Sequence, residues 1–315
     1  MSFLLENGKR RRRLGCLKNY RIFVALIFHL KILKMYTPSF LFMKKTLLFL
    51  SFSVFFLTAC NKVEDDPVNP PQDNQIVPLV DGIIPDAVTD YDGNTYDAVR
   101  IGEQVWMASN LRTTHYADGT EITFSTEISD SIALYYYVDI GRELTDYGYW
   151  YNWLAVMRNS PSTNAIPSGV QGICPRGWHV PSNAEWGQLT DYLSSQSQYV
   201  CCNNSNDIAK SLASETGWDS YTDSGMEFNT FNIMCCVGNP RFSNNATGFN
   251  AFPAGYYGYG CQAACVGKEA SCWSTSEHAE NSDLVLGFGL NYSSTHVCGL
   301  ISTKRFGHSV RCVRD

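Results

Sequence analysis

The sequence CPRGWHVPSNAEW, residues 174–186, predicts the start of a helix in the middle of the folded part of the chain. Ser182 is a typical N-cap, and a glutamate follows three residues later, the spacing of a capping box. From there Trp186, Leu189 and Leu193 recur at helical spacing and would form one apolar face. We therefore expect a helix that begins at Ser182 and packs on a hydrophobic core.

The segments around this helix predict further short elements. The stretches 91–96 and 98–107 contain β-branched and aromatic residues beside an Asp-Gly turn, which indicates two short strands. Residues 147–157 are apolar nearly all round and predict a buried helix. Residues 207–215 predict a third, short helix that ends before Gly217.

Beyond residue 218 the chain is rich in Gly, Asn, Ser and Tyr, and its apolar runs are short. We expect brief strands separated by long loops. The expected strands span residues 228–234, 248–254, 284–290 and 309–313. The whole pattern predicts an α+β fold, with two to three helices and an irregular antiparallel sheet whose long loops are tied by disulfides.

Residues 43–59 have the features of an export signal. Two lysines precede an apolar run, which ends at Leu57-Thr58-Ala59 directly before Cys60. This resembles the lipobox of bacterial lipoproteins, which implies that Cys60 is acylated and becomes the mature N-terminus. Translation would then begin at Met43, with residues 1–42 an over-extension of the gene model, or alternatively residues 1–42 are an unusually long basic leader of the same signal.

Residues 60–85 are polar, acidic and rich in Pro, and we expect a solvated tether. The acidic trio at residues 64–66 resembles a signal for the outer face of the outer membrane, although an ordinary polar linker would look the same. The expected location is therefore the outer membrane, held by the lipid anchor and facing the cell surface, with the periplasmic face as the alternative.

The charge of the mature chain argues against nucleic acid as a partner. Residues 1–59 hold 11 of the 24 basic residues and one of the 30 acidic ones, which leaves 13 basic and 29 acidic residues and a net charge of −16. Such a surface repels phosphate backbones.

Ten cysteines remain once Cys16 and Cys60 are set aside, and an even number in an exported chain predicts disulfides. Zinc is the alternative use, but paired C-x2-C spacings are absent. The doublets 201–202 and 235–236 fit disulfide geometry poorly within themselves, so they should bond outward, to each other or elsewhere. The ten cysteines are Cys174, Cys201, Cys202, Cys235, Cys236, Cys261, Cys265, Cys272, Cys298 and Cys312.

Seven sequence blocks occur in an order that resembles a known family. The blocks are residues 92–96, 101–111, 174–186, 217–218, 248–255, 273–277 and 309–315. Together they look like the Fibrobacter succinogenes major paralogous domain family, over residues 86–315. The resemblance implies a C-type-lectin-like or sulfatase-modifying-factor-like fold, in which a helix pair lies on an irregular antiparallel sheet and the chain ends meet. It also implies a surface lipoprotein to which no enzymatic activity is assigned.

The resemblance also bears on the cysteines. Cys174 and Cys312 lie in two of the matching blocks, and a disulfide between them would close a loop of about 140 residues, for which chain entropy gives roughly 4–5 kcal/mol. The cysteine-rich stretch 201–298 is not part of the family pattern, and its bridges would be loop staples particular to this chain.

The sequence predicts neither catalysis nor a cofactor. His179 lies in an apolar segment and reads as a core residue, and Glu277 is expected to bind loop backbone. The calcium-binding tripeptides of sugar-binding lectins are absent, so we expect no metal of that type. Cys261 and Cys265 come near the spacing of the copper-binding cysteines of sulfatase-modifying enzymes, but their loop is unlike that motif.

Two aromatic and polar loops are the candidate ligand-binding surface. Tyr257, Tyr259, Asn291 and Tyr292 are side chains of the kind that stack on sugars or adapt to protein surfaces. Ordinary loop composition would explain them as well. The functional hypothesis is a non-catalytic surface lipoprotein that binds an extracellular glycan or protein. The alternatives are a structural envelope protein without a ligand and a sulfatase-modifying-type oxidase.

Overall fold

The computed structural model describes residues 81–221, 233–239 and 244–315. The elements in chain order are β1 (Gly82–Thr89), β2 (Thr95–Ile101), β3 (Gln104–Met107), β4 (Thr123–Phe124), β5 (Leu134–Tyr136), α2 (Leu144–Tyr147), β6 (Trp150–Tyr151), α3 (Trp153–Met157), β7 (Trp178–His179), α4 (Asn183–Ser195), the 3-10 turn η1 (Ser197–Tyr199), α5 (Ala209–Leu212), β8 (Tyr256–Gly258), β9 (Gln262–Ala264), β10 (Glu269–His278), β11 (Asn281–Asn291), β12 (Cys298–Thr303) and β13 (Val313–Arg314).

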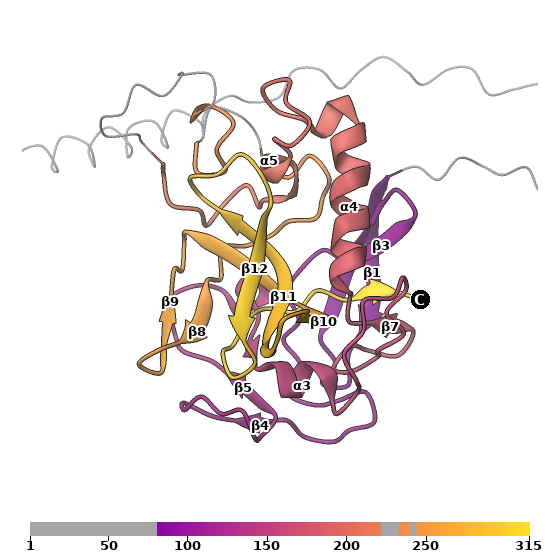
Figure 1. The fold of residues 1–315 in the computed structure, drawn as a ribbon, viewed down its shortest axis with the longest axis vertical. Coiled ribbons are helices and arrows are strands. Elements are labelled where there is room, and N and C mark those ends of the chain that lie inside the picture. The colour runs from indigo at the N-terminus through magenta and orange to yellow at the C-terminus, as the bar shows by residue number, and fades with distance from the viewer. Residues whose placement is uncertain (1–80, 222–232, 240–243) are drawn as a thin grey trace, which may run out of the picture. The chain divides into compact units, whose positions relative to one another are not determined.

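A five-stranded sheet joins the two ends of the described chain. Its order is β1-β2-β3-β13-β7, and every pairing in it is antiparallel. The C-terminal strand β13 lies between β3 and β7, where Val313 pairs with Trp106 on one side and His179 on the other (Figure 1). Strand β1 begins at Gly82, inside the stretch 60–85 that the sequence predicted as tether.

Helix α4 packs between this sheet and the three-stranded sheet β10-β11-β12 (Figure 1). The ring of Trp186 stacks on Trp106 at a centroid distance of 4.3 Å and on Phe288 at 4.6 Å. Leu189 and Leu193 are fully buried in the same cluster. The predicted apolar face of the helix is confirmed, and it forms the centre of the core that holds both sheets.

The predicted start of this helix is also confirmed. The Ser182 hydroxyl accepts a hydrogen bond from the Glu185 backbone N–H at 3.1 Å, and the Glu185 carboxylate accepts one from the Ser182 N–H at 2.8 Å. These reciprocal bonds satisfy two N–H groups that the first turn of a helix leaves without partners.

The prediction of a single helix over residues 147–157 is wrong. The segment contains the end of α2, strand β6 and then α3. Gly148 ends α2 with φ +67°, and a Cβ there would lie 2.6 Å from the Leu111 carbonyl oxygen. Asn152 then caps α3 by accepting from the Ala155 N–H at 3.0 Å. A glycine in a left-handed turn and an N-cap five residues into the segment override its apolar character.

Other expectations meet mixed outcomes. The hairpin turn at Asp92-Gly93 is confirmed between β1 and β2, and the expected third helix is confirmed as the shorter α5. The expected strand at 284–290 lies within β11, whereas 248–254 forms only an isolated bridge. Most of the strand expected at 228–234 lies outside the described residues. The fold is α+β, with few helices and mostly antiparallel sheets.

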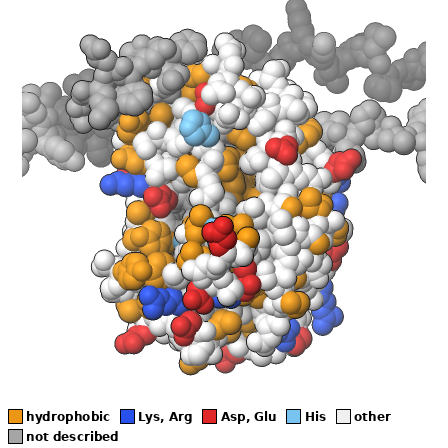
Figure 2. Space-filling view, viewed as in Figure 1, with side chains coloured by type: hydrophobic (Ala, Val, Ile, Leu, Met, Phe, Trp, Pro, Cys, Tyr) orange, Lys and Arg blue, Asp and Glu red, His pale blue; other side chains and the backbone are white. Residues whose placement is uncertain are grey.

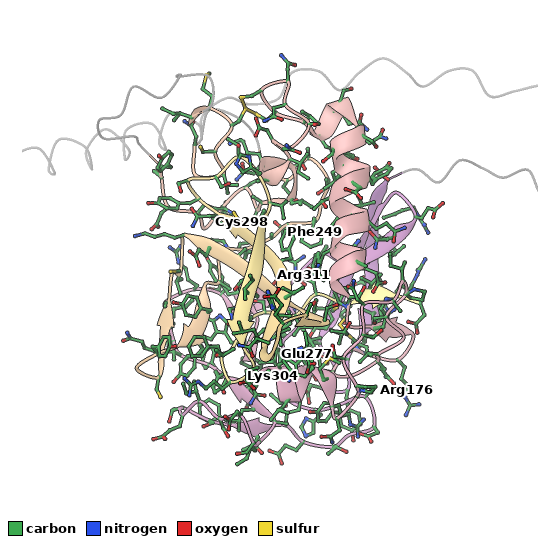
Figure 3. All side chains as sticks on the ribbon, in the orientation of Figure 1. Arg176, Phe249, Glu277, Cys298, Lys304 and Arg311 are labelled. Carbon is green, nitrogen blue, oxygen red and sulfur yellow. A yellow bond between two sulfur atoms is a disulfide. The ribbon has the colours of Figure 1, made fainter. Side chains whose placement is uncertain are left out.

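Arg311 is the largest charged group of the core and has no exposed surface. Its guanidinium donates to the Asn110 side-chain oxygen and to the carbonyls of Met107, Phe249 and Asn250, at 2.5–3.0 Å. It also lies 4.7 Å from the centre of the Phe249 ring. Both side chains are labelled in Figure 3. Burial lowers its pKa to about 10. The hydrogen bonds of Arg311 therefore link the C-terminal segment to the end of β3 and to the loop that precedes β8.

The surface in Figure 2 intersperses acidic, basic and hydrophobic side chains. On that face the described residues form no continuous basic area of the kind that binds phosphate backbones. Within the described ranges no helix is long and apolar enough to cross a membrane.

Candidate functional site

A polar pocket lies beside the β1–β2 turn. We call it the Tyr149 pocket; it has a volume of about 390 Å³ and is lined by Asp92, Asn94, Arg112, Thr114, Leu144, Thr145 and Tyr149. Its position depends on the turn, in which the Asp90 carboxylate accepts from the Asn94 backbone N–H at 2.9 Å and from the Tyr96 hydroxyl at 2.6 Å. These bonds hold the turn, and with it Asp92, against the body of the sheet.

Asp92 is a fixed anion at the edge of this pocket. Its carboxylate accepts from the Thr113 hydroxyl at 3.0 Å, from the Thr114 backbone N–H at 2.5 Å and from the Thr114 hydroxyl at 3.1 Å. The His115 Nδ1 also lies 2.5 Å from it. Partial burial would raise the pKa of Asp92, but these hydrogen bonds outweigh it and hold the pKa below its usual value. The side chain is therefore ionised at neutral pH.

Arg112 supplies the cation of the pocket. Its guanidinium lies 4.6 Å from the centre of the Tyr96 ring and donates to the Thr95 carbonyl at 3.1 Å. The Tyr96 hydroxyl in turn accepts from the Arg112 backbone N–H at 3.0 Å. Both ends of the arginine are thus positioned by the same tyrosine, so the pocket presents an oriented guanidinium together with carboxylate, amide and hydroxyl groups.

A row of four aromatic rings adjoins the pocket. Strand alternation explains its origin, because in β5 the side chains of Leu134 and Tyr136 are buried while Tyr135 faces the other side. The ring of Tyr135 lies 4.9 Å from Tyr149, which in turn lies 5.7 Å from Tyr137. Phe124 of β4 extends the row, 5.5 Å from Tyr135. We call Phe124, Tyr135, Tyr137 and Tyr149 the aromatic row.

The row is open to solvent at both ends. Phe124 is 50% exposed and Tyr137 is 38% exposed, whereas the two central tyrosines are partly buried. Burial and nearby carboxylates, including Asp92, raise the pKa values of Tyr135 and Tyr149. These phenols stay protonated at neutral pH, so they offer an apolar face and a hydroxyl at once.

Thr114, His115 and Asp92 do not have the arrangement of a nucleophile–base–carboxylate triad. Asp92 and the Thr114 hydroxyl both contact the same nitrogen of His115, Nδ1, at 2.5 and 3.0 Å. A catalytic triad needs the nucleophilic hydroxyl on one imidazole nitrogen and the carboxylate on the other. Thr114 is therefore not placed for activation by His115.

Among the residues predicted from the sequence, Tyr257 needs a correction. It is 1% exposed, its ring stacks on Tyr136 at 4.6 Å, and its hydroxyl donates to the carbonyls of Thr126 and Cys261. The alternation of β8 directs this side chain into the core. It is therefore not an exposed contact for a ligand.

Tyr259, Asn291 and Tyr292 lie at or near the surface, but on different elements. Tyr259 is 68% exposed in the β8–β9 turn and packs edge-on against Phe306. Asn291 ends β11 and donates to the Glu269 carboxylate at 3.2 Å, and Tyr292 packs against Tyr221. Among the described contacts, none joins Tyr259 to Asn291 or Tyr292. The structure does not gather the four predicted residues into one site.

Sequence reasoning missed the Tyr149 pocket and the aromatic row. The available signal was the run Tyr135-Tyr136-Tyr137, whose alternation in a strand places at least one tyrosine on the outer face. The sequence predicts Asp92 as a residue of a hairpin turn and of a block that resembles the family, but not as a ligand-binding residue. No local pattern connects residues near 92, 112, 124, 135 and 149.

The cysteines confirm disulfide bonding but correct the expected loop staples. A disulfide joins Cys174 to Cys312, and Cys235 contacts both Cys201 and Cys202 at disulfide distance. The expected bridges of the later loops are wrong, because Cys261, Cys265, Cys272 and Cys298 carry unpaired thiols. Cys261 directly precedes β9 and Cys265 directly follows it. An extended strand of this length places their Cα atoms about 13 Å apart, which is too far for a disulfide and for two ligands of one metal ion.

Glu277 differs from its expected role. Its carboxylate pairs with the Lys304 ammonium at 2.6 Å rather than with loop backbone, and both residues are labelled in Figure 3. The Lys304 ammonium also lies 4.7 Å from the centre of the Trp153 ring. The lipid-attachment residue Cys60 and the signal segment 43–59 lie outside the described residues.

Comparison with curated proteins and with solved structures finds no match. The family model described as the Fibrobacter succinogenes major domain matches residues 99–314, which is more than half of the chain. This match includes the sheet β10-β11-β12, strands β3, β7 and β13 of the five-stranded sheet, helix α4, the aromatic row and most of the pocket, whereas β1 and the start of β2 precede it. The chain therefore belongs to the Fibrobacter succinogenes major domain family.

Proposed function

We propose that this chain is a non-catalytic surface lipoprotein whose domain binds a glycan at the Tyr149 pocket and the aromatic row. The observation that carries the proposal is the continuous row of four rings beside a pocket of charged, amide and hydroxyl groups. A sugar ring has apolar C–H faces and polar hydroxyl edges. Aromatic faces match the former, and oriented donors and acceptors match the latter.

The charge of the site favours a neutral or basic ligand over a phosphate-bearing one. Asp92 is ionised, and the Glu121 carboxylate lies close enough to Tyr135 to raise the pKa of that phenol. Arg112 is the cation among the pocket-lining residues, and its guanidinium is already placed over Tyr96. Two carboxylates against one arginine would repel a polyanion. A peptide ligand would use similar aromatic and polar contacts, so the experiment separates the two.

The same proposal includes a C-type-lectin-like fold and an outer-membrane anchor. The fold is supported by the pairing of β13 with β3, which brings the chain ends together, and by helix α4 on the sheets. The anchor rests on the lipobox-like sequence before Cys60. If Cys60 is acylated, Cys60→Ser should abolish labelling by a palmitate analogue and release the protein to the soluble fraction. Continued labelling of that variant would contradict the anchor without bearing on the glycan site.

A glycan array probed with the full chain tests the binding function. Tyr137→Ala and Tyr149→Ala should each weaken binding to any glycan found by about fivefold, since a stacked ring contributes on the order of 1 kcal/mol. Tyr259→Ala is the matched control, because Tyr259 is also an exposed tyrosine but lies on the β8–β9 turn. All three variants should keep the melting temperature of the parent within a few degrees. A chelator should not change binding.

Three outcomes would contradict the proposal. If Tyr259→Ala weakens binding and the row variants do not, the ligand contacts the later loops instead. If peptides bind the same variants in the same order while glycans do not, the ligand is a protein. If the array and a peptide library both stay silent, the structural envelope alternative gains support.

A further inference from the structure

Three cysteine sulfurs lie close together in a second cavity, which is separate from the Tyr149 pocket. The Sγ atoms of Cys201, Cys202 and Cys235 all lie within 4.8 Å of one another. Cys235 is buried, and the other two are partly buried. The structure brings Cys235 to disulfide distance of both Cys201 and Cys202. One sulfur can hold one such bond, so the two pairings are alternatives.

The local backbone explains why two adjacent side chains face the same cavity. In an extended strand, neighbouring side chains point to opposite sides. Here Cys202 and Asn203 both have left-handed backbone, with φ of 55° and 57°. The Cys201 N–H donates to the Asp207 carbonyl at 2.8 Å and the Asn204 N–H donates to the Cys201 carbonyl at 3.3 Å, which closes the loop. Cys201 and Cys202 therefore both line the cavity.

One of the three sulfur spacings, that between Cys201 and Cys202, is that of a three-thiolate metal site, whereas Cys235 lies at disulfide distance of both. An ion with metal–sulfur bonds of about 2.3 Å in a trigonal plane places its ligand sulfurs about 4.0 Å apart. The Sγ atoms of Cys201 and Cys202 lie 3.9 Å apart. Cys235 would complete the triangle once its disulfide is open, by moving outward from bonding distance.

The rest of the cavity suits a soft ion in a negatively charged complex. The cavity has a volume of about 360 Å³, and its lining includes Met234, a thioether, and Lys210, a primary amine. Lys210 is buried and donates to the carbonyls of Cys236 and Asn239. Within the described residues its ammonium has no carboxylate partner at ion-pair distance. An anionic metal–thiolate centre would offset that charge.

We propose that Cys201, Cys202 and Cys235, when reduced, bind one thiophilic d10 metal ion through three thiolates. Soft sulfur ligands select soft ions, and three sulfurs suit a trigonal ion better than the four-coordinate site of structural zinc. This inference does not depend on the glycan proposal, because it concerns a different cavity and different residues.

The proposed chemistry balances with a small-molecule thiol as reductant. Two such thiols give two electrons and two protons to the Cys235 disulfide and become a disulfide themselves. The Cys235 sulfur and its former partner are then thiols. The ion replaces the protons of the three thiols, so binding releases three protons and becomes tighter as pH rises. The metal-bound and disulfide states exclude each other.

Metal titration of the full chain in detergent tests the site. The protein is reduced with dithiothreitol, freed of reductant under nitrogen and titrated with Cd²⁺ alone or with Ag⁺ alone, while thiolate-to-metal absorption is followed in the ultraviolet. We expect a single tightly held ion per chain. If Cd²⁺ binds more tightly than Ag⁺, the site prefers a divalent ion, and the reverse order means that it prefers a monovalent one.

The matched variants are Cys235→Ser and Cys298→Ser. Cys298 is exposed and unpaired, so its replacement removes a thiol from another element. Cys235→Ser should weaken binding by more than about 100-fold, since loss of only an outer-shell partner already weakens metal affinity by roughly 10–100-fold. Cys298→Ser should leave the affinity unchanged. Equal effects of the two replacements, or no tight binding by the parent protein, would overturn the proposal.

A second measurement uses only the parent protein, so it still tests the proposal if Cys235→Ser does not fold. The reduced parent chain is alkylated with iodoacetamide with and without Cd²⁺, and labelled peptides are counted by mass spectrometry. The ion should slow the labelling of Cys201, Cys202 and Cys235 by about tenfold or more and leave Cys298 unaffected. Equal labelling of the trio in both samples would show that the three sulfurs do not bind the ion together.

Discussion

The Nε2 atom of His179 lies 2.7 Å from the Oε1 atom of Glu185, and both side chains are only 3% exposed. The other ring nitrogen, Nδ1, lies 2.7 Å from a carboxylate oxygen of Asp315. An ionised carboxylate can only accept hydrogen bonds, so both nitrogens must donate. His179 is therefore an imidazolium that links β7, the first turn of α4 and the last residue of the chain.

This link makes stability depend on pH in a defined direction. Burial alone would lower the pKa of His179, but the hydrogen bonds to Glu185 and Asp315 outweigh it, and the pKa is raised. A raised pKa in the folded state gives stability that is fully present below the unfolded value, near 6.5, and is lost as pH rises through the folded pKa. We expect the free energy of unfolding to fall over that window more steeply in the parent than in His179→Gln.

Denaturant unfolding at a series of pH values measures this difference. His278→Gln is the control, because His278 ends β10 and its ring accepts from the Glu280 N–H instead of pairing with Glu185 or Asp315. That variant should keep the pH slope of the parent. A parent protein with the same slope as His179→Gln would mean that the imidazolium link contributes nothing.

His308 should act in the opposite direction. It is fully buried beside the rings of Trp273 and Tyr256, and burial lowers its pKa to about 3. Its nitrogens contact the hydroxyls of Ser271 and Ser302 at 2.7 and 2.8 Å, which suits the neutral ring. A depressed histidine pKa means that the unfolded state binds the proton first, so stability falls as pH drops below about 6.5.

The expected loss from His308 is about 2 kcal/mol between pH 6.5 and pH 5, at 1.36 kcal/mol per pH unit. His308→Gln should be less stable at neutral pH, but its stability should decline less between those pH values. Equilibrium unfolding at pH 5 and pH 6.5 gives the two differences. Parallel declines of parent and variant would show that His308 does not titrate far below its usual value.

The sequence predicts features that depend on neighbouring residues. The capping box of α4 was predictable because Ser182 and Glu185 bond each other across three residues, whatever surrounds them. The Asp92-Gly93 turn was predictable for the same reason. The helix expected over 147–157 was not found because Gly148 is determined by a contact with Leu111, far along the chain. Apolar character alone does not reveal such a close approach.

The candidate site was harder to predict for a related reason. The aromatic row unites Phe124 of β4, Tyr135 of β5 and Tyr149, which directly precedes β6, and β4 pairs with β5 in parallel. The burial of Tyr257 likewise depends on which side of β8 faces Tyr136. A shift of one residue in a strand would exchange the buried and exposed faces, and composition does not define that register.

Replacement of Arg311 should be among the most damaging changes in the domain. Arg311→Lys keeps the charge but cannot reach the four acceptors that the guanidinium satisfies, among them the carbonyls of Met107 and Phe249. We expect a loss of about 3–5 kcal/mol, because buried acceptors and a buried cation lose their partners. Thermal or denaturant unfolding measures it.

Arg176→Lys is the control for that change. Arg176 is exposed and extends away from the body of the domain in Figure 3. Its replacement should alter the free energy of unfolding by no more than about 0.5 kcal/mol. If the two substitutions have equal effects, the hydrogen bonds of Arg311 do not stabilise the core in the way that their geometry implies.

Removal of the Cys174–Cys312 disulfide should reveal how strongly this link constrains the unfolded chain. The two Cα atoms lie 6.0 Å apart across a sequence separation of 138 residues, and chain entropy over such a loop corresponds to about 4–5 kcal/mol. The double variant Cys174→Ala, Cys312→Ala removes the link together with two buried sulfurs. Cys272→Ala removes one buried, unpaired sulfur from the neighbouring cluster around α4, and it should cost only about 1 kcal/mol. Denaturant unfolding of the two variants therefore separates lost packing from the lost link. A double variant that loses no more than twice the Cys272→Ala value would mean that the disulfide adds no stability beyond its packing.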